Sequence, residues 1–260
     1  MTIDSKIPTA TRTRFAMEHP RAFLALEAAA GVVMAIGSLW AFVAIAGEIP
    51  EQSRMVRTDL FIATWLEHVG TERGESIFAM VSWLGAPVLS ALLVMAIIAF
   101  SYRRDWLRAG ALAAAGVGGT LLNYGLKSLF HRGRPEYSSE FMHHLSYSFP
   151  SGHAMDSLVV YGFLAFLILE RTTAPVKRRL IVAGAAVLIV AIGFSRMYLG
   201  VHYLSDVVGG FLAGMVWLMV CIAGYEFAKT RNLQTDEVHQ PTPGLGTRQP
   251  TQRAVHPDEL

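Results

Sequence analysis

The stretch SFPSGHAMDSLVVYGFLAFLIL, residues 148–169, joins a polar cluster directly to a long apolar segment. Residues 154–169 are apolar enough to form a helix in a bilayer, where a complete span needs about 20 residues. Pro150, Ser151, Gly152 and His153 stand where that helix would begin. The stretch therefore predicts a membrane helix with a polar end. That end has a chemical role only if other segments supply partners for its serine and histidine.

The composition of the whole chain also points to a membrane protein. Of its 260 residues, 53% are apolar and 16% are charged, whereas soluble domains carry about 25% charged residues. The net charge of +2 provides no basic stripe for a nucleic acid, so we exclude a nucleic-acid-binding protein. The single cysteine, Cys221, rules out an intramolecular disulfide.

Six apolar segments are predicted to span the membrane, namely residues 22–47, 76–102, 106–126, 154–169, 180–194 and 203–225. We therefore expect an all-α fold, an integral membrane bundle of six transmembrane helices within residues 21–231. Residues 1–20 are expected to form a polar cytoplasmic leader. Residues 232–260 are rich in Gln, Pro and Thr, and they are expected to form a disordered cytoplasmic tail.

The distribution of Lys and Arg predicts the orientation, because cytoplasmic loops are enriched in these residues. Six spans put both termini on one side, and that side receives 15 of the 22 Lys and Arg residues. Both termini are therefore expected in the cytoplasm, and the compact design leads us to expect a bacterial cytoplasmic (inner) membrane. The amphipathic stretch 57–69 follows the first span. It is expected to be a helix on the outer surface, a cap over the bundle, or a short packed connector.

Three polar clusters fall at the outer ends of the last four spans, in KSLFHRGRP (127–135), PSGH (150–153) and SRMYLGVHYLSD (195–206). In the first cluster, Lys127 and His131 are four residues apart and share a helix face. Arg134 follows where Gly133 and Pro135 end the helix. Lys and Arg together suit an anion with several oxygens, and Arg can hold a phosphate through two parallel hydrogen bonds.

The second cluster combines a helix start with a histidine. Ser151 is placed to cap the fourth span, beyond which free backbone N–H groups attract anions. Gly152 lets a ligand approach the backbone closely. His153 would then stand at the edge of the anion, where it can give or take a proton near neutral pH.

The third cluster pairs a histidine with a carboxylate. His202 and Asp206 are four residues apart at the start of the sixth span. An aspartate that accepts the hydrogen of one ring nitrogen leaves the other nitrogen free, which makes His202 a candidate nucleophile. Arg196 adds a third cation to the site.

Each cluster has an alternative explanation. Lys127 and Arg132 can extend to lipid headgroups, Ser151 can be only a helix cap, and His202 with Asp206 can be a structural pair. A metal site is a further alternative, with the possible ligands His131, His143, His144, His153, His202 and Asp206. The nearby cations favour an anion over a metal ion, but the residues alone do not separate a phosphatase from an anion binder.

In order and spacing, the three clusters resemble the signature of the type 2 phosphatidic acid phosphatase superfamily. Its patterns are Lys, six residues, Arg-Pro; then Pro-Ser-Gly-His; then Ser-Arg, five residues, His, three residues, Asp. The chain meets all three, and the resemblance covers roughly residues 76–229. The apolar spans resemble the membrane lipid-phosphatase branch of this family, which includes undecaprenyl-diphosphate phosphatases.

The resemblance implies a role for each site residue. His202 would attack phosphorus and form a phosphohistidine, Asp206 would orient His202, and His153 would protonate the leaving oxygen. The phosphoryl oxygens would be held by Lys127, Arg134, Ser151, Gly152 and Arg196. No metal and no cofactor would be needed.

The implied substrate is a lipid phosphate at the outer membrane face, which is the periplasmic or exterior side. We expect undecaprenyl diphosphate first, because His131 and Arg132 add basic groups for a second phosphate. Phosphatidate, phosphatidylglycerol phosphate and a lipid A phosphate are alternatives. An anion transporter is a rival outside the enzymes, but it predicts charges at mid-membrane and interrupted spans. An idle lipid-phosphate binder is a second rival, against which the complete histidine and aspartate set argues.

Overall fold

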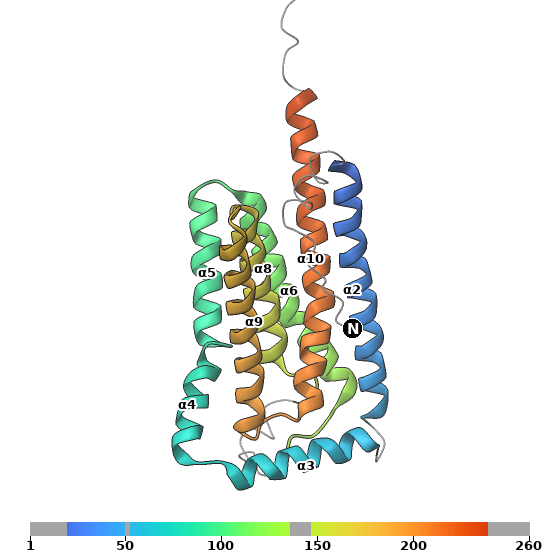
Figure 1. Ribbon diagram of the computed structural model, residues 1–260, viewed down its shortest axis with the longest axis vertical. Coiled ribbons are helices and arrows are strands. Elements are labelled where there is room, and N and C mark those ends of the chain that lie inside the picture. The colour runs from blue at the N-terminus through green and yellow to red at the C-terminus, as the bar shows by residue number, and fades with distance from the viewer. Residues whose placement is uncertain (1–19, 50–52, 136–146, 239–260) are drawn as a thin grey trace, which may run out of the picture.

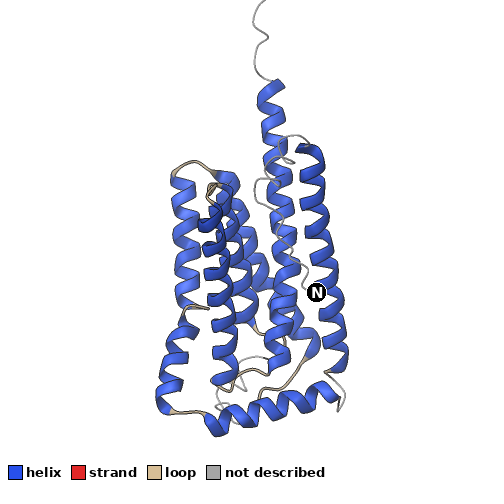
Figure 2. Ribbon diagram, viewed as in Figure 1, coloured by secondary structure: helices blue, strands red, loops and turns tan. Residues whose placement is uncertain are grey.

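The computed structural model describes residues 20–49, 53–135 and 147–238, and within these ranges the chain is all helical, with no strand (Figure 2). The helices are α2 (Pro20–Glu48), α3 (Arg54–Val69), α4 (Glu72–Trp83), α5 (Pro87–Tyr102), α6 (Trp106–Phe130), α8 (Gly152–Glu170), α9 (Pro175–Tyr198) and α10 (Leu204–Val238). The expected all-α class is therefore confirmed for the described residues.

The long helices form a bundle, and two shorter helices lie at one end of it (Figure 1). Helix α10 packs against α8 and α2, while α6 packs against α5 and α8. Helix α3 lies across the end of the bundle where α6 ends and α10 begins (Figure 1). This arrangement brings segments that are far apart in the sequence to one end of the bundle.

Five helical stretches are long and apolar enough to cross a membrane, at 28–48, 72–102, 152–170, 175–198 and 204–232. They correspond to five of the six predicted spans. The remaining predicted span, 106–126, lies in α6, which is 25 residues long and packs inside the bundle. Its hydropathy is lower because it carries several glycines and the buried polar residue Asn123.

Local sequence accounts for several helix starts. Ser53 and Thr71 cap α3 and α4, and each side chain accepts a hydrogen bond from a backbone N–H of the first turn, at 3.2 and 3.1 Å. Pro87 and Pro175 occupy the first turns of α5 and α9, where the missing N–H of proline costs no helical hydrogen bond.

The second predicted span, 76–102, is interrupted in the structure. Helix α4 ends at Trp83 and α5 begins at Pro87. The hydroxyl of Tyr161 donates to the carbonyl of Leu84 at 2.7 Å, and a Cβ on Gly85 would lie 2.5 Å from Ile192 and 3.1 Å from His153. The break therefore lets the backbone approach the start of α8 closely.

The amphipathic stretch 57–69 forms most of α3. The buried residues of this helix are Asp59, Ala63 and Leu66. Phe61 and Trp65 are exposed instead. The face of α3 that packs against the protein thus carries a buried carboxylate, which hydrophobic periodicity does not predict.

Helix α10 continues to Val238, so it includes residues 232–238 of the predicted tail. The rest of the predicted tail, 239–260, and most of the predicted leader, 1–19, lie outside the described residues.

Gly210 marks the closest packing between α10 and the start of α8. A Cβ there would lie 2.6 Å from the backbone oxygen of Ser151 and 3.0 Å from the Cβ of Ala154. Because the backbone oxygen cannot move aside, we expect Gly210→Ala to destabilise the protein by about 1–3 kcal/mol, measured by thermal unfolding in detergent. The control is Gly110→Ala on α6, whose Cβ would meet no atom within 4 Å and which should preserve or raise stability. Equal melting temperatures for the two variants would contradict this packing.

Candidate active site

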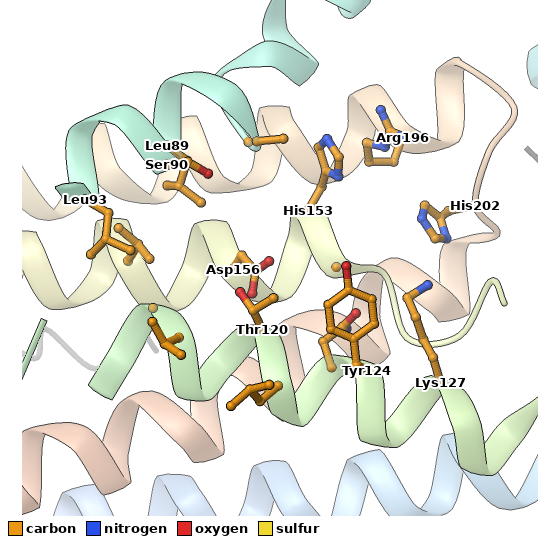
Figure 3. Close-up of a pocket in the computed structure, with 18 of the residues that line it drawn as sticks. Leu89, Ser90, Leu93, Thr120, Tyr124, Lys127, His153, Asp156, Arg196 and His202 are labelled. Atoms are coloured by element: carbon orange, nitrogen blue, oxygen red, sulfur yellow. The ribbon is translucent and has the colours of Figure 1, made fainter. Parts of the chain in front are cut away.

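A cavity of about 530 Å³ opens at the end of the bundle where α6 and α9 end and α8 and α10 begin. Of the eight site residues predicted from the sequence, six line it: Lys127, Arg134, Gly152, His153, Arg196 and His202. The other two, Ser151 and Asp206, are fully buried beside them. Figure 3 shows His153 and His202 facing the same cavity, with Lys127 and Arg196 around it.

His202 is backed by Asp206, as its spacing predicts. Its Nδ1 lies 3.5 Å from Oδ2 of Asp206 and 3.4 Å from the hydroxyl of Ser148. Nε2 is therefore the ring nitrogen that is turned away from the carboxylate. Burial lowers the pKa of His202 to about 4, although the hydrogen bond with Asp206 acts in the opposite direction. The imidazole is thus neutral at pH 7, which leaves a lone pair available for attack.

Asp206 is held by donors from several segments. Its Oδ2 accepts from the backbone N–H of Tyr203 at 2.8 Å and from the hydroxyl of Ser148. Its Oδ1 accepts from Nη1 of Arg132 at 2.7 Å. The backbone oxygen of Asp206 accepts from the N–H of Ser151 at 2.9 Å, which joins the start of α10 to the start of α8. The carboxylate is consequently fixed in orientation as well as in place.

Three cations converge on the cavity, and each is more than nine-tenths buried: Lys127, Arg134 and Arg196. Each is oriented by a neutral oxygen. Lys127 donates to the carbonyl of Tyr147, Arg134 to the carbonyl of Val201 at 2.8 Å, and Arg196 to the hydroxyl of Ser82. Several buried like charges are costly unless an anion compensates them. Their arrangement therefore suits a bound anion such as a phosphoryl group.

Ser151 does not act as a conventional helix cap. It precedes α8 with an extended backbone, but its side chain makes no capping hydrogen bond. Its hydroxyl oxygen is buried and has no hydrogen-bond partner in the structure, and the same is true of Nε of Arg196. Both groups can donate to an oxyanion. The alternative that Ser151 serves only as a cap is therefore not supported.

Gly152 and His153 open the first turn of α8 beside the cavity. A Cβ on Gly152 would lie 3.1 Å from Oδ1 of Asn123, so this glycine keeps the helix start close to α6. His153 comes from a different segment than His202, and the two rings reach the cavity separately (Figure 3). Two histidines with this placement can serve as nucleophile and as proton donor in one reaction.

The contacts of Arg132 differ from those predicted from the sequence, which were with lipid headgroups or with a second phosphate of the substrate. Its guanidinium contacts Asp59 and Asp206, and its side chain is only 9% exposed. His131 is exposed, and its ring packs edge-on against Tyr147. Neither residue lines the cavity, so neither supplies a basic group for a second phosphate there.

Sequence reasoning missed three polar groups of this region. Ser148 belongs to the opening stretch but carries no motif of its own. Asp156 lies one turn after His153 and lines the cavity near Thr120 (Figure 3), a position that the helical repeat could have indicated. Asp59 is remote in sequence, and no local signal connects it to the site.

Two of the metal ligands considered above, His143 and His144, lie outside the described residues. Within the part of the chain that the structure describes, no group of three or more His, Cys, Asp or Glu side chains is arranged to hold a metal ion. The described residues therefore give no support to the alternative of a metal site.

Known proteins resemble this chain in sequence and in fold. Residues 105–229 match the PAP2 superfamily. Phosphatidylglycerophosphatase B of Bacillus subtilis (strain 168) is 34% identical over 157 residues, which cover 58% of this chain and 75% of that protein. The putative undecaprenyl-diphosphatase YbjG of Escherichia coli (strain K12) is 40% identical over 93 residues, which cover 34% of this chain and 42% of that protein.

A solved structure agrees in fold. The crystal structure of the first transmembrane PAP2 type phosphatidylglycerolphosphate phosphatase, from Bacillus subtilis, superimposes with a TM-score of 0.66 at 28% sequence identity. The match covers 74% of this chain and 96% of that chain. The helical bundle, the apolar spans and these matches agree with one another, and the chain belongs to the PAP2 superfamily, in its membrane lipid-phosphatase branch.

Proposed function

We propose that this protein removes phosphate from a lipid at the outer membrane face through a phosphohistidine formed on His202. The observation that carries the proposal is a buried, neutral histidine backed by Asp206 in a cavity with three buried cations. An anion binder needs the cations, but it does not need a nucleophile with an orienting carboxylate. A phosphatase needs both.

The proposed reaction has two displacements at phosphorus. The Nε2 lone pair of His202 forms an N–P bond while the P–O bond to the lipid breaks, and His153 gives a proton to the leaving oxygen. Asp206 stabilises the positive charge that develops on the imidazole. Water then attacks phosphorus, His153 accepts its proton, and the N–P bond breaks to release inorganic phosphate and restore His202.

The cations supply most of the remaining catalysis. Phosphoryl transfer depends mainly on positioning and on stabilising charge that spreads over the phosphoryl oxygens. Lys127, Arg134 and Arg196 line the cavity and each donates to a neutral oxygen, and we propose that they also bind the phosphoryl oxygens. Ser151 and the Gly152 backbone would add neutral donors at the start of α8.

The shape of the cavity supports a lipid substrate. From the cationic end, its lining continues between α5 and α6 along the apolar residues Leu89, Leu93, Val117 and Leu121. A molecule with a phosphate at one end and a hydrocarbon chain at the other fits this change in polarity. We propose that α6 also spans the membrane, as the third of six spans, and that both termini lie in the cytoplasm. The phosphate site would then lie at the outer headgroup level.

Two lipid classes are candidate substrates. Undecaprenyl diphosphate, the first expectation, retains the support of the similarity to YbjG. Arg132 was expected to help bind the second phosphate of this lipid, but in the structure it forms ion pairs with Asp59 and Asp206. Phosphatidylglycerol phosphate is favoured by the match to phosphatidylglycerophosphatase B over 75% of that protein. We therefore place phosphatidylglycerol phosphate first and undecaprenyl diphosphate second, ahead of phosphatidate and lipid A phosphate.

The proposal is tested by phosphate release from detergent-purified protein, with a panel of these four lipids. We expect release to be unaffected by excess EDTA, because protein cations rather than a metal ion hold the phosphoryl oxygens. Phosphatidylglycerol phosphate should have the highest kcat/KM. Loss of activity in EDTA that returns on adding a divalent metal would contradict the metal-independent reaction. A higher kcat/KM for undecaprenyl diphosphate would reverse the substrate order.

A further inference from the structure

We propose that Asp59 and Arg132 are positioning residues that hold the Asp206 carboxylate in its working orientation, which makes helix α3 a part of the catalytic apparatus. This inference rests on the proposed function, in which Asp206 orients His202. It concerns two residues that the family motif does not include and a helix that the sequence analysis left without a role.

Arg132 bridges two buried carboxylates. Its Nη1 donates to Oδ1 of Asp206 at 2.7 Å, and its Nη2 donates to Oδ2 of Asp59 at 2.8 Å. The side chains of Asp59 and Asp206 are 2% and 0% exposed. A planar guanidinium can make these two contacts at once, whereas an ammonium has no rigid fork. Asp59, Arg132 and Asp206 therefore form a chain of hydrogen bonds that connects α3 to the nucleophile His202.

The two oxygens of Asp206 have different donors, and this difference shows what Arg132 does. His202, Ser148 and the backbone N–H of Tyr203 all contact Oδ2. Arg132 is the side chain that contacts Oδ1. Without it, Oδ1 loses its charged donor, and the orientation of the carboxylate depends on the contacts of Oδ2 alone.

Asp59 secures Arg132 and also the residue that precedes Asp206. Its Oδ1 accepts from the backbone N–H of Ser205 at 3.0 Å, and its Oδ2 accepts from the Ser205 hydroxyl. That hydroxyl in turn accepts from Nη1 of Arg132 at 2.6 Å. One carboxylate on α3 thus fixes both the guanidinium and the first turn of α10.

The backbone around Arg132 is equally constrained. Helix α6 ends at His131 in a left-handed conformation with φ of 49°, and the carbonyl of Arg132 accepts from the N–H of Ser148 at 2.8 Å. The guanidinium also lies over the ring of Tyr203, 4.5 Å from its centre. These contacts hold Arg132 beside Asp59 and Asp206.

Asp59 can also be viewed as a purely structural clamp between α3 and α10. A clamp of this kind predicts lower stability with unchanged chemistry per folded molecule. A positioning role predicts a lower kcat with a nearly unchanged KM, because neither Asp59 nor Arg132 lines the substrate cavity. The two possibilities are thus separable by kinetics.

The first test compares Asp59→Asn and Arg132→Lys with the wild-type protein, using folded, monodisperse protein in detergent and phosphatidylglycerol phosphate. Asparagine has the size of aspartate but loses its charge, and lysine keeps the charge but loses the fork. We expect each to lower kcat by about tenfold or more, as for loss of one charge-assisted hydrogen bond, with KM within about twofold. The control is Glu170→Gln at the far end of α8, which breaks a partly buried ion pair with Lys229 and should leave kcat unchanged.

The decisive test is a double-mutant cycle with Asp206→Asn. If Asp59 acts through Asp206, adding Asp59→Asn to Asp206→Asn should change kcat by less than about twofold. The same fold loss in both backgrounds would overturn the inference, because Asp59 would then affect kcat independently of Asp206. Unchanged kcat in Asp59→Asn and Arg132→Lys, with His202→Ala inactive, would overturn the inference alone. Full activity in His202→Ala would overturn the proposed function itself.

Discussion

Replacing His202 with alanine is expected to abolish turnover, with kcat lowered by about 10⁴-fold or more. The variant lacks the nucleophile that forms the N–P bond, and the cations alone bind phosphate without cleaving it. Because His202 is 4% exposed and contacts Asp206, the truncation also leaves Asp206 without its ring partner. The measurement is phosphate release from phosphatidylglycerol phosphate at saturating substrate.

The matched control for this prediction is His68→Ala. His68 lies on α3 at the same end of the bundle, but it is exposed and bonds only the carbonyl of Thr64 in its own helix. It should retain wild-type activity. Near-normal activity in His202→Ala, or equal losses in both variants, would refute the assignment of His202 as nucleophile.

Asp206→Asn is expected to lower kcat by about 10²-fold to 10⁴-fold while KM changes little. Oδ2 of Asp206 accepts from Tyr203, Ser148 and His202, so an amide nitrogen at that position would face donors. An amide oxygen there would keep the contacts, but it would not stabilise the positive charge on His202. Binding is largely preserved because Asp206 does not line the cavity.

Asp105→Asn is the control for the loss of a carboxylate. Asp105 caps α6, where its side chain accepts from the N–H of Arg108 at 3.2 Å, and asparagine caps helices about as well as aspartate. This variant should keep its activity. If Asp206→Asn had the same kcat as the wild type, Asp206 could not be the residue that orients His202.

The parts of the site that the sequence predicted are those carried by local spacing. His202 and Asp206 are one helical turn apart, and Ser151, Gly152 and His153 are consecutive, so their proximity follows from a helix start alone. Lys127 and Arg134 flank a helix end that Gly133 and Pro135 impose. Consecutive spans cross the membrane in opposite directions, so the end of one span and the start of the next lie on the same side. This predicts that the helix ends that carry the motifs lie on one side of the membrane.

The features that the sequence could not predict depend on contacts between distant segments. Asp59 is 73 residues from Arg132, and no local pattern in the sequence connects the two residues. The break between α4 and α5 arises because Gly85 must pass close to Ile192 and His153. Hydropathy is high on both sides of this break, so an apolar-segment search joins the two helices into one span.

Arg132 shows how tertiary contacts change the meaning of a charge. In the sequence it adds to a basic cluster and favours a substrate with two phosphates. In the structure its charge is compensated by Asp59 and Asp206, and among the described residues the cations that line the cavity are Lys127, Arg134 and Arg196. The positive charge that faces the substrate therefore comes from residues other than Arg132.

The central claim is that a covalent phosphohistidine forms on His202, and the most direct measurement is to trap it. Purified protein is mixed with phosphatidylglycerol phosphate labelled with ³²P in its terminal phosphate, quenched in alkali within milliseconds, digested and mapped. A phosphohistidine survives base and is lost in acid. We predict label with this behaviour on the peptide that contains His202 and none in His202→Ala. Label on another residue, or turnover by the wild type with no protein-bound label at any quench time, would contradict the account.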